Sequence, residues 1–408
     1  MKAEFFRKKR MKQLLCSVLA FGLVTAVSPA AVCATEGTEP PAAYYEAVQT
    51  DALANWPQGP AIYAESGILV DLDTQEILYS KNIDKQLYPA SITKVMTTLV
   101  AIESSSPEEP VTFSQHALDS IEWDSSNIGC RLNETLTMEQ CWYAMMLNSA
   151  NEVCCGVAEH ISGSIEAFVE KMNQKAAELG CTNTHFSNPN GLPDETHYTT
   201  AHDMALIANA AYQNETFRQV FSTRQYEIPP TPQYTETRYL YNHHKMIQPD
   251  TEYYYEGCLG GKTGYTETAL NTLVTIASRN GKNLLCVTMR TQGRQVYTDT
   301  ASLFDYGFSQ TFPADEAALL TVAEPTVTET PTPEPSPTAT EVQDEENGSS
   351  KGGSSSAADT VQDMFPVWIP LTAVFVIAVG LFVFKLYLES ARKKRRRRRQ
   401  RRRSEEDK

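Results

Sequence analysis

Apolar residues recur every three or four positions between residues 88 and 103, a spacing that predicts a helix with one buried face. This helix would begin near Pro89, and its apolar positions are Ile92, Val95, Met96, Leu99, Val100 and Ile102. The same spacing predicts helices over 136–161, with a break near Ser149, and over 164–180, 200–214 and 298–308. The centre of the chain is therefore expected to be mostly helical.

Two β-rich stretches flank these helices. Residues 66–82 predict a hairpin that turns at Asp73–Gln75, and residues 271–289 predict a second hairpin that turns at Asn280-Gly281. Strands at both ends of the globular region with helices between them predict an α+β fold. Its antiparallel sheet would be closed by the terminal segments and flanked by helices, some of which form a helical subdomain.

The two ends of the chain differ in composition from its centre. Residues 1–34 have a basic start, an apolar stretch and small residues before a cleavage site after Ala34, which predicts a secretory signal peptide. Residues 365–388 contain about 20 mostly apolar positions, which predict a transmembrane helix, and the basic tail at 389–408 would be cytoplasmic. Between these ends we expect an N-terminal segment (35–55), a globular domain (56–313) and a disordered stalk rich in Pro, Thr and Glu and then in Gly and Ser (314–364).

The net charge of −15 is unevenly distributed. Lys and Arg are concentrated in the two ends, so the part between them is strongly acidic, which argues against nucleic-acid binding. An arginine run beside an apolar span is typical of a tail held against anionic lipid on the cytoplasmic side. The sequence therefore predicts a single-pass membrane protein whose globular domain is extracellular.

The cysteines and histidines do not indicate a disulfide framework or a metal site. Two of the nine cysteines fall in the predicted signal peptide, and the other seven are an odd number that includes the adjacent Cys154 and Cys155. Most of the seven are expected to be small buried side chains. The pair His243–His244 lacks zinc-ligand spacing and more often serves packing or hydrogen bonding. No metal or cofactor is predicted.

The first motif with candidate chemistry is Ser91-x-x-Lys94. The two side chains are one helical turn apart, so the lysine could remove the serine proton if burial lowered its pKa. The alternative is a solvated edge of the helix, and the motif alone does not decide between them. Thr98 lies on the same strip of the helix and is expected to serve packing only.

Two further motifs follow. Ser149 and Asn151 lie at a helix junction, where they could relay a proton and orient a substrate amide, or simply cap the next helix. Lys262-Thr263-Gly264 precedes the second hairpin, and on an edge strand it could accept a bound peptide and its carboxylate. Taken alone, this third motif would more often be a turn.

The order S-x-x-K, S-x-N, K-T-G is the set found in penicillin-binding proteins and class A β-lactamases. Together with "YPASITKVMT", "NTHFSNPNGLPDETHYTTAHDMALIA" and "GGKTGYT", these motifs closely resemble the D-alanyl-D-alanine carboxypeptidases of the serine peptidase S11 family, which are low-molecular-mass penicillin-binding proteins. The resemblance extends over residues 56–308 and implies a β-lactamase/transpeptidase-like fold in a protein of the bacterial cell membrane.

The resemblance also implies a reaction. The enzyme would remove the terminal D-alanine from peptidoglycan stem pentapeptides, would be acylated by β-lactam antibiotics and would need no cofactor. The catalytic residues would be Ser91, Lys94, Ser149, Asn151 and Lys262. The substrate-binding residues would be Thr263, Gly264, Tyr265 and Arg294. The backbone N–H groups of Ser91 and Tyr265 would form the oxyanion hole.

The chain departs from many family members in three respects. It has no room for a second β-rich domain between residues 308 and 321, and its predicted anchor is a full span rather than a helix lying on the membrane. Gly261 also replaces the apolar residue that commonly precedes K-T-G. None of these differences involves the predicted catalytic residues.

Two alternatives share the motifs. One is a membrane-tethered β-lactamase, but class A enzymes use a glutamate after the S-x-N element, and residues 183–198 follow the carboxypeptidase pattern instead. The other is a non-catalytic β-lactam-binding or wall-binding sensor, against which the intact pair of Ser91 and Lys94 argues. Release of D-alanine and the lifetime of a penicillin adduct would distinguish the three.

Overall fold

The computed structural model describes residues 39–122, 124–313 and 316–320. The predicted signal peptide, transmembrane helix and basic tail, and nearly all of the predicted stalk, lie outside these residues. Within the described ranges, no helix combines the length and the apolar character needed to cross a membrane.

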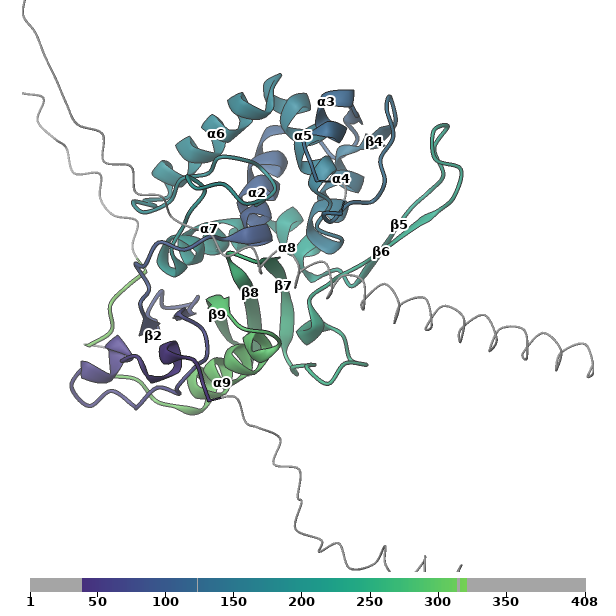
Figure 1. The fold of residues 1–408 in the computed structure, drawn as a ribbon. Helices are drawn as coiled ribbons and strands as arrows, with labels where there is room; N and C mark the ends of the chain where they lie inside the picture. Colours follow the sequence, from purple (N-terminus) through teal and green to yellow (C-terminus); the bar gives the residue numbers. More distant parts are fainter. Residues whose placement is uncertain (1–38, 123, 314–315, 321–408) are drawn as a thin grey trace, which may run out of the picture. The chain divides into compact units, whose positions relative to one another are not determined.

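A five-stranded antiparallel sheet lies at the centre of the described body (Figure 1). Its strands are β1 (Ser66–Asp71), β2 (Ile77–Lys81), β7 (Cys258–Thr266), β8 (Leu270–Arg279) and β9 (Lys282–Thr291). They pair in the order β2-β1-β9-β8-β7, so strands from the two ends of the described chain meet where β1 pairs with β9. The predicted antiparallel sheet closed by terminal segments is confirmed.

Both predicted hairpins are present. In the turn between β1 and β2, the carboxylate of Asp71 accepts hydrogen bonds from the backbone N–H groups of Asp73 and Thr74. In the turn between β8 and β9, Asn280 and Gly281 have φ angles of 54° and 84°. These positive angles belong to the type I′ turn, which an Asn-Gly pair favours and which fixes the register of both strands.

Helices and two small sheets fill the chain between the first hairpin and β7. The α-helices, including the one after β9, are α2 (Lys94–Ser104), α3 (Gln115–Asp119), α4 (Met138–Leu147), α5 (Asn151–Ser162), α6 (Ile165–Glu178), α7 (Ala201–Gln213), α8 (Glu215–Ser222) and α9 (Gln295–Ser309). The 3-10 helices are η1 (Ala42–Tyr45), η2 (Gln49–Ala52), η3 (Ala90–Thr93) and η4 (Lys245–Ile247). The small sheets pair β3 (Pro110–Thr112) with β4 (Thr135–Thr137), and β5 (Gln225–Ile228) with β6 (Arg238–Tyr241).

The predicted helices are confirmed, with one refinement. The helix that was expected to contain Ser91 begins as the 3-10 turn η3 and becomes α-helical at Lys94. The break near Ser149 separates α4 from α5, as predicted. The start of α4 is fixed by a capping box in which Thr137 and Gln140 each accept a hydrogen bond from the other's backbone N–H.

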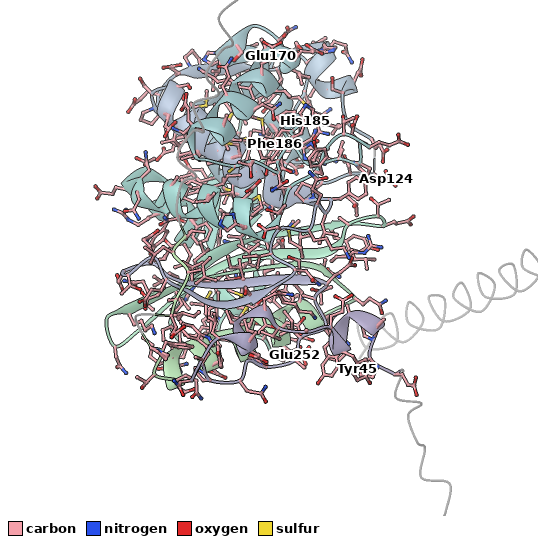
Figure 2. The ribbon with its side chains drawn as sticks, turned by 90° about the vertical axis from the view of Figure 1, so that its left-hand side faces the viewer. Tyr45, Asp124, Glu170, His185, Phe186 and Glu252 are labelled. Carbon is pink, nitrogen blue, oxygen red and sulfur yellow. The ribbon has the colours of Figure 1, made fainter. Side chains whose placement is uncertain are left out.

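The two faces of the sheet belong to two separate apolar cores. Ile68 and Val70 of β1 pack in the core shared with α2 and α4–α8, whereas Leu69 packs in the core shared with α9. Figure 1 shows α9 on one side of the sheet and the helical part on the other, and Figure 2 shows Phe186 in the helical part and Tyr45 far from it. Both faces of β1 are buried, which explains why its sequence is apolar without alternation.

The described body extends beyond the predicted domain of 56–313. Before it, the carbonyl of Ala43 accepts a hydrogen bond of 2.6 Å from Nζ of the buried Lys81. After it, the carbonyl of Ala318 accepts one of 2.8 Å from the N–H of Ile77. Segments on both sides of the predicted boundaries therefore pack against β2.

The cysteines are consistent with the prediction made for them. All seven in the described residues are free thiols, and five of them are buried. The described residues contain no group of three or more side chains placed to hold a metal ion.

A buried ion pair attaches β6 to the loop before β4. Arg238 and Glu134 are almost completely buried, and Nη2 of the arginine lies 2.6 and 2.8 Å from the two carboxylate oxygens. The hydroxyl of Thr231 donates a further hydrogen bond of 2.6 Å to this carboxylate. The loop over 124–134 is therefore attached to β6 by an ion pair that is shielded from water.

We expect Arg238→Met to lower the free energy of unfolding by about 3–5 kcal/mol, because it leaves the Glu134 charge buried without its partner. Urea unfolding at pH 7 measures the loss. The control is Lys85→Met, which breaks the partly exposed pair between Lys85 and Glu65 and should lower the free energy by about 1 kcal/mol or less. Equal, small losses in the two variants would contradict the expectation.

Candidate active site

Ser91 lies in a strained turn at the start of α2. The preceding residue, Ala90, has a φ of 51°, a left-handed conformation that is uncommon for a residue with a side chain. The Ser91 hydroxyl accepts a hydrogen bond of 3.1 Å from Nζ of Lys94, one turn further along the chain. The solvated helix edge is thus excluded, because Lys94 is completely buried.

Lys94 joins three separate parts of the chain. Besides Ser91 Oγ, its Nζ donates to Oδ1 of Asn151 at 2.7 Å and to the backbone carbonyl of Asn190 at 2.5 Å. Burial lowers the pKa of Lys94, since a charged ammonium loses its hydration there. A lowered pKa makes the neutral amine more accessible, and only the neutral amine can accept the Ser91 proton.

Ser149 and Asn151 face the two lysines from the junction of α4 and α5. Ser149 has a φ of 58°, and Asn151 is the first residue of α5. The residue that caps α5 is Ala150, which has no side chain able to do so. Capping therefore does not explain this motif, whereas the contact of each side chain with a lysine does.

Lys262-Thr263-Gly264 lies on β7, the edge strand of the sheet. The edge-strand prediction is therefore confirmed, and the turn is excluded. Nζ of Lys262 donates to Oγ of Ser149 at 3.2 Å and to the carbonyl of Thr263 at 2.8 Å. Burial, and next the nearby charge of Lys94, place the pKa of Lys262 well below its usual value.

Gly264 allows β7 to approach the turn that carries Ser91. A Cβ atom at this position would lie 2.9 Å from the backbone nitrogen of Ser91 and 2.3 Å from the hydroxyl oxygen of Thr272. No side chain fits into this space. The free edge of β7, with the exposed Tyr265, therefore lies directly beside the serine.

The structure thus brings together the five residues predicted to be catalytic. We refer to them as the serine–lysine cluster, which consists of Ser91, Lys94, Ser149, Asn151 and Lys262. Thr263, Gly264 and Tyr265 follow on the same strand as Lys262. The cluster is assembled from η3 and α2, from the junction of α4 and α5, and from β7, which are far apart in the sequence.

Arg294 is the one predicted substrate-binding residue that lies apart from these contacts. It precedes α9, its side chain is exposed, and its guanidinium pairs with Glu252 at 3.2 Å. None of its described hydrogen bonds reaches the serine–lysine cluster. Its role in binding substrate stays a prediction.

The loop over 187–192 supports the cluster and was not predicted to do so. The carbonyl of Asn190 binds Lys94, as described above, and the carbonyl of Pro189 accepts a hydrogen bond of 2.6 Å from the Thr97 hydroxyl. Gly191 has a φ of 86°, and a Cβ atom there would lie 2.0 Å from the carbonyl oxygen of Ala90. The Asn, Pro and Gly residues of this loop predict a turn, but the sequence does not show which backbone carbonyls of the turn accept hydrogen bonds from the cluster and its helix.

His197 is a further supporting residue that the sequence did not single out. Its Nδ1 accepts the N–H of Ser187 at 3.0 Å, so its Nε2 carries the proton and lies 2.8 Å from the hydroxyl of Thr93. That hydroxyl in turn donates to the carbonyl of Ala90 at 2.8 Å. A chain of hydrogen bonds therefore holds the left-handed residue before Ser91.

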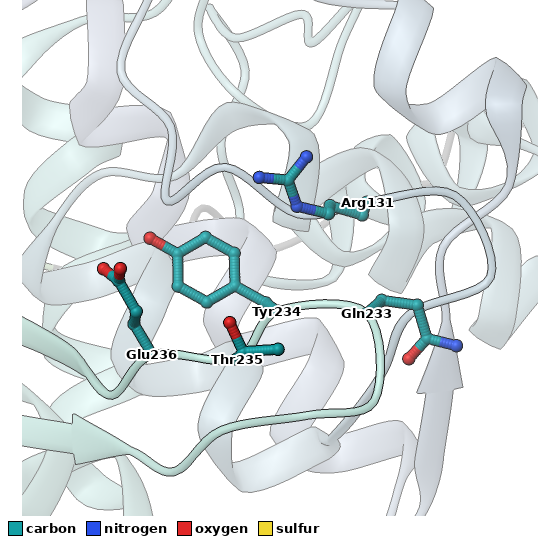
Figure 3. Close-up of a pocket in the computed structure, with 5 residues that line it drawn as sticks. All are labelled: Arg131, Gln233, Tyr234, Thr235 and Glu236. Carbon is teal, nitrogen blue, oxygen red and sulfur yellow. The ribbon is translucent and has the colours of Figure 1, made fainter.

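The pocket in Figure 3 lies elsewhere. It has a volume of about 260 Å³ and is lined by Arg131 and by Gln233–Glu236 from the loop between β5 and β6. Two guanidinium groups lie near the ring of Tyr234, with Arg131 at 5.5 Å and Arg238 at 3.9 Å from its centroid. The pocket contains no member of the serine–lysine cluster.

We expect His197 to make stability depend on pH. Burial lowers its pKa to about 4 from an ordinary value of 6.5, so below pH 6.5 the unfolded chain binds a proton that the folded protein does not. The stabilisation is complete above pH 6.5 and is lost as the pH falls towards 4. Between pH 7 and pH 5 this single group should account for about 2 kcal/mol of the loss.

Urea unfolding of His197→Asn at pH 7 and pH 5 tests this expectation. The variant should lose less stability than the parent protein over this interval, whatever its stability at pH 7. Ser222→Ala, which changes an exposed side chain that does not titrate in this range, serves as the control and should follow the parent. Equal pH dependence in parent and His197→Asn would refute the assignment.

Comparisons with known proteins identify the family. The model of the peptidase S11 family, described as D-alanyl-D-alanine carboxypeptidase, matches residues 53–293. The chain is 31% identical over 306 residues to D-alanyl-D-alanine carboxypeptidase DacF of Bacillus subtilis, covering 74% of this chain and 72% of that protein. It is 32% identical over 259 residues to D-alanyl-D-alanine carboxypeptidase DacB2 of Mycobacterium tuberculosis, covering 62% and 84% respectively.

Solved structures show the same fold. The crystal structure of the Streptomyces K15 DD-transpeptidase matches with a TM-score of 0.59 at 26% identity, covering 62% of this chain and 100% of that one. The D-alanyl-D-alanine carboxypeptidase from Mycobacterium tuberculosis H37Rv matches with a TM-score of 0.58 at 29% identity, covering 67% and 99%. The family model, the relatives and the fold together show that the chain belongs to the S11 family of serine-type D-alanyl-D-alanine carboxypeptidases.

Proposed function

We propose that this carboxypeptidase acts through an acyl-enzyme on Ser91, with Lys94 as the general base. The observation that carries the proposal is the hydrogen bond of 3.1 Å between Lys94 Nζ and Ser91 Oγ, made by a lysine that is completely buried. Burial favours the neutral amine, whose two N–H groups can donate to Asn151 Oδ1 and to the carbonyl of Asn190, which leaves its lone pair to accept the proton of Ser91 Oγ.

In the first step, Ser91 Oγ attacks the carbonyl carbon of the bond between the two terminal D-alanines, and its proton passes to Lys94 Nζ. The oxyanion that forms would be stabilised by the backbone N–H groups of Ser91 and Tyr265. The close approach of Gly264 to the nitrogen of Ser91 supports this arrangement, because it brings β7 to within contact distance of the nucleophile.

Ser149 and Lys262 would complete the proton transfers. A hydrogen bond of 3.2 Å joins their side chains, and Asn151, two residues after Ser149, is bonded to Lys94. A proton delivered through Ser149 to the nitrogen of the leaving D-alanine would let the peptide bond break. Water then hydrolyses the ester on Ser91 and releases the shortened peptide, which restores the free hydroxyl.

The substrate we propose is a peptidoglycan stem pentapeptide that ends in D-alanyl-D-alanine. Thr263 would bind its terminal carboxylate, Asn151 would orient an amide of the peptide, and the free edge of β7 at Gly264 and Tyr265 would pair with its backbone. Penicillin presents a strained amide to the same serine, so it would acylate Ser91 as a covalent inhibitor. Arg294 is proposed as an additional contact of the carboxylate.

We also propose the cellular placement that the sequence predicts. A signal peptide (1–34) would export the catalytic domain, and a stalk (314–364) would connect it to a transmembrane helix (365–388) with a cytoplasmic tail (389–408). Family members are cell-wall enzymes, so an extracellular domain would meet its substrate.

Ser91→Ala should abolish both D-alanine release and the penicillin adduct. The full-length chain is incubated with a pentapeptide ending in D-alanyl-D-alanine, and released D-alanine and the mass of the protein after penicillin treatment are measured. We expect a loss of at least about a thousandfold, because the nucleophile is removed. Ser222→Ala, at an exposed serine of α8, is the control and should keep full activity.

Each other outcome favours a different function. A stable adduct on the parent protein without D-alanine release would favour a sensor. Rapid turnover of penicillin would favour a β-lactamase.

The rate of acylation should rise with pH, with a midpoint below the usual lysine pKa of 10.5, because Lys94 must be neutral to accept the proton. Lys94→Arg should remove the rise together with most of the activity, since a guanidinium stays protonated. Acylation by a fluorescent penicillin between pH 5 and pH 10 measures both, and circular dichroism checks that the variant folds. A Lys94→Arg protein with the parent's profile would rule out Lys94 as the base.

A further inference from the structure

The segment Tyr241–His244 joins the two sides of the serine–lysine cluster. It begins at the last residue of β6 and leads into η4, and on one side it is bonded to the end of α4. The N–H of Tyr241 donates to Oδ1 of Asn148 at 3.0 Å, and the N–H of His243 donates to the carbonyl of Leu147 at 3.2 Å. We call this segment the strap.

On its other side the strap is locked to the sheet by His244. The ring is completely buried, and its Nε2 lies 2.7 Å from the hydroxyl oxygen of Thr275 on β8. Nδ1 accepts the N–H of Met246 at 3.2 Å, so Nε2 carries the proton and donates it to Thr275. The ring therefore has a fixed orientation and a partner for each nitrogen.

Gly261 provides the space that this ring occupies. Gly261 pairs with Thr275 across β7 and β8, and a Cβ atom at Gly261 would lie 2.1 Å from Cδ2 and 2.3 Å from Nε2 of His244. The imidazole thus fills the place of a side chain on β7. The glycine before Lys262 and the second histidine of the pair, to which the sequence gave no role in the reaction, form one packing unit.

The two attachments of the strap are adjacent in sequence to two members of the cluster. Asn148 precedes Ser149, and Gly261 precedes Lys262. The Oγ of Ser149 and the Nζ of Lys262 are 3.2 Å apart. The four residues of the strap therefore connect the backbones that carry this pair.

We propose that the strap sets the separation of Ser149 and Lys262, and that His244 is the positioning residue that locks it to the sheet, through Thr275 of β8 and the space at Gly261 of β7. The inference rests on the proposed role of these two side chains in proton transfer. Asn242 stiffens the strap from within, because its side chain donates to the carbonyl of Thr223 and accepts the N–H of His244. Movement of the strap would separate the pair without touching the substrate.

The test compares His244→Ala and Thr275→Val in the full-length chain. Each removes one half of the lock, so each should lower kcat for D-alanine release by about tenfold and change KM by less than about twofold. The double variant should resemble the single variants rather than multiply their losses, because both break the same hydrogen bond. Thr275→Val keeps the shape of the side chain and provides the test should His244→Ala fail to fold.

Two controls separate positioning from loss of stability. Thr275→Ser keeps the hydroxyl and should restore kcat to within about threefold of the parent. Leu284→Ala opens a cavity in the same apolar core on β9, away from the strap, and should lower the unfolding midpoint but leave kcat unchanged.

The proposal fails if Thr275→Val retains the parent's kcat, if the two losses multiply in the double variant, or if Leu284→Ala loses as much kcat as His244→Ala. These outcomes differ from a failure of the proposed function, in which the parent protein itself would release no D-alanine. If the parent releases D-alanine normally and kcat is unchanged in His244→Ala, in Thr275→Val and in the double variant, this inference alone is overturned.

Discussion

The structure depends on one buried amine. Nζ of Lys94 contacts Ser91 Oγ, Asn151 Oδ1 at the start of α5, and the backbone carbonyl of Asn190, which lies 96 residues further along the chain. All three distances are between 2.5 and 3.1 Å. An amine without water needs every one of these partners, because an unpaired buried polar group is strongly unfavourable. The packing of α2, α5 and this loop is thereby tied to the position of a single nitrogen.

The backbone around the amine is held in conformations that the residues themselves do not favour. Ala90 and Ser149 both have left-handed φ angles, and each adjoins or belongs to the serine–lysine cluster. Such angles persist only where surrounding contacts impose them. For Ala90 these contacts are the bond from Thr93, the close approach of Gly191 and the hydrogen bond of 2.8 Å from Thr272 to the preceding carbonyl.

The sequence predicts the parts of the fold that have a period or a turn signal. The hairpin at Asn280-Gly281 and the helices follow from local rules, and the three motifs identify the cluster because their order is specific. The hydrogen bond between Asn190 and Lys94 could not be predicted, because Asn190 makes it through its backbone carbonyl, which every residue type has. The strap could not be predicted for another reason. The local sequence does not show that His244 lies against Gly261, and only the folded structure shows that its ring fills the space at the residue before Lys262.

The charges of Lys94 and Lys262 affect each other, and this bears on the direction of proton transfer in the proposed mechanism. Both are buried, and the charge of Lys94 is one cause of the lowered pKa of Lys262. Two ammonium groups in one water-free site are unfavourable, so in the proposed mechanism a proton taken up by Lys94 from Ser91 would make a positive charge on Lys262 less favourable and would favour release of a proton from Lys262. Ser149, bonded to Lys262, lies where such a proton would leave.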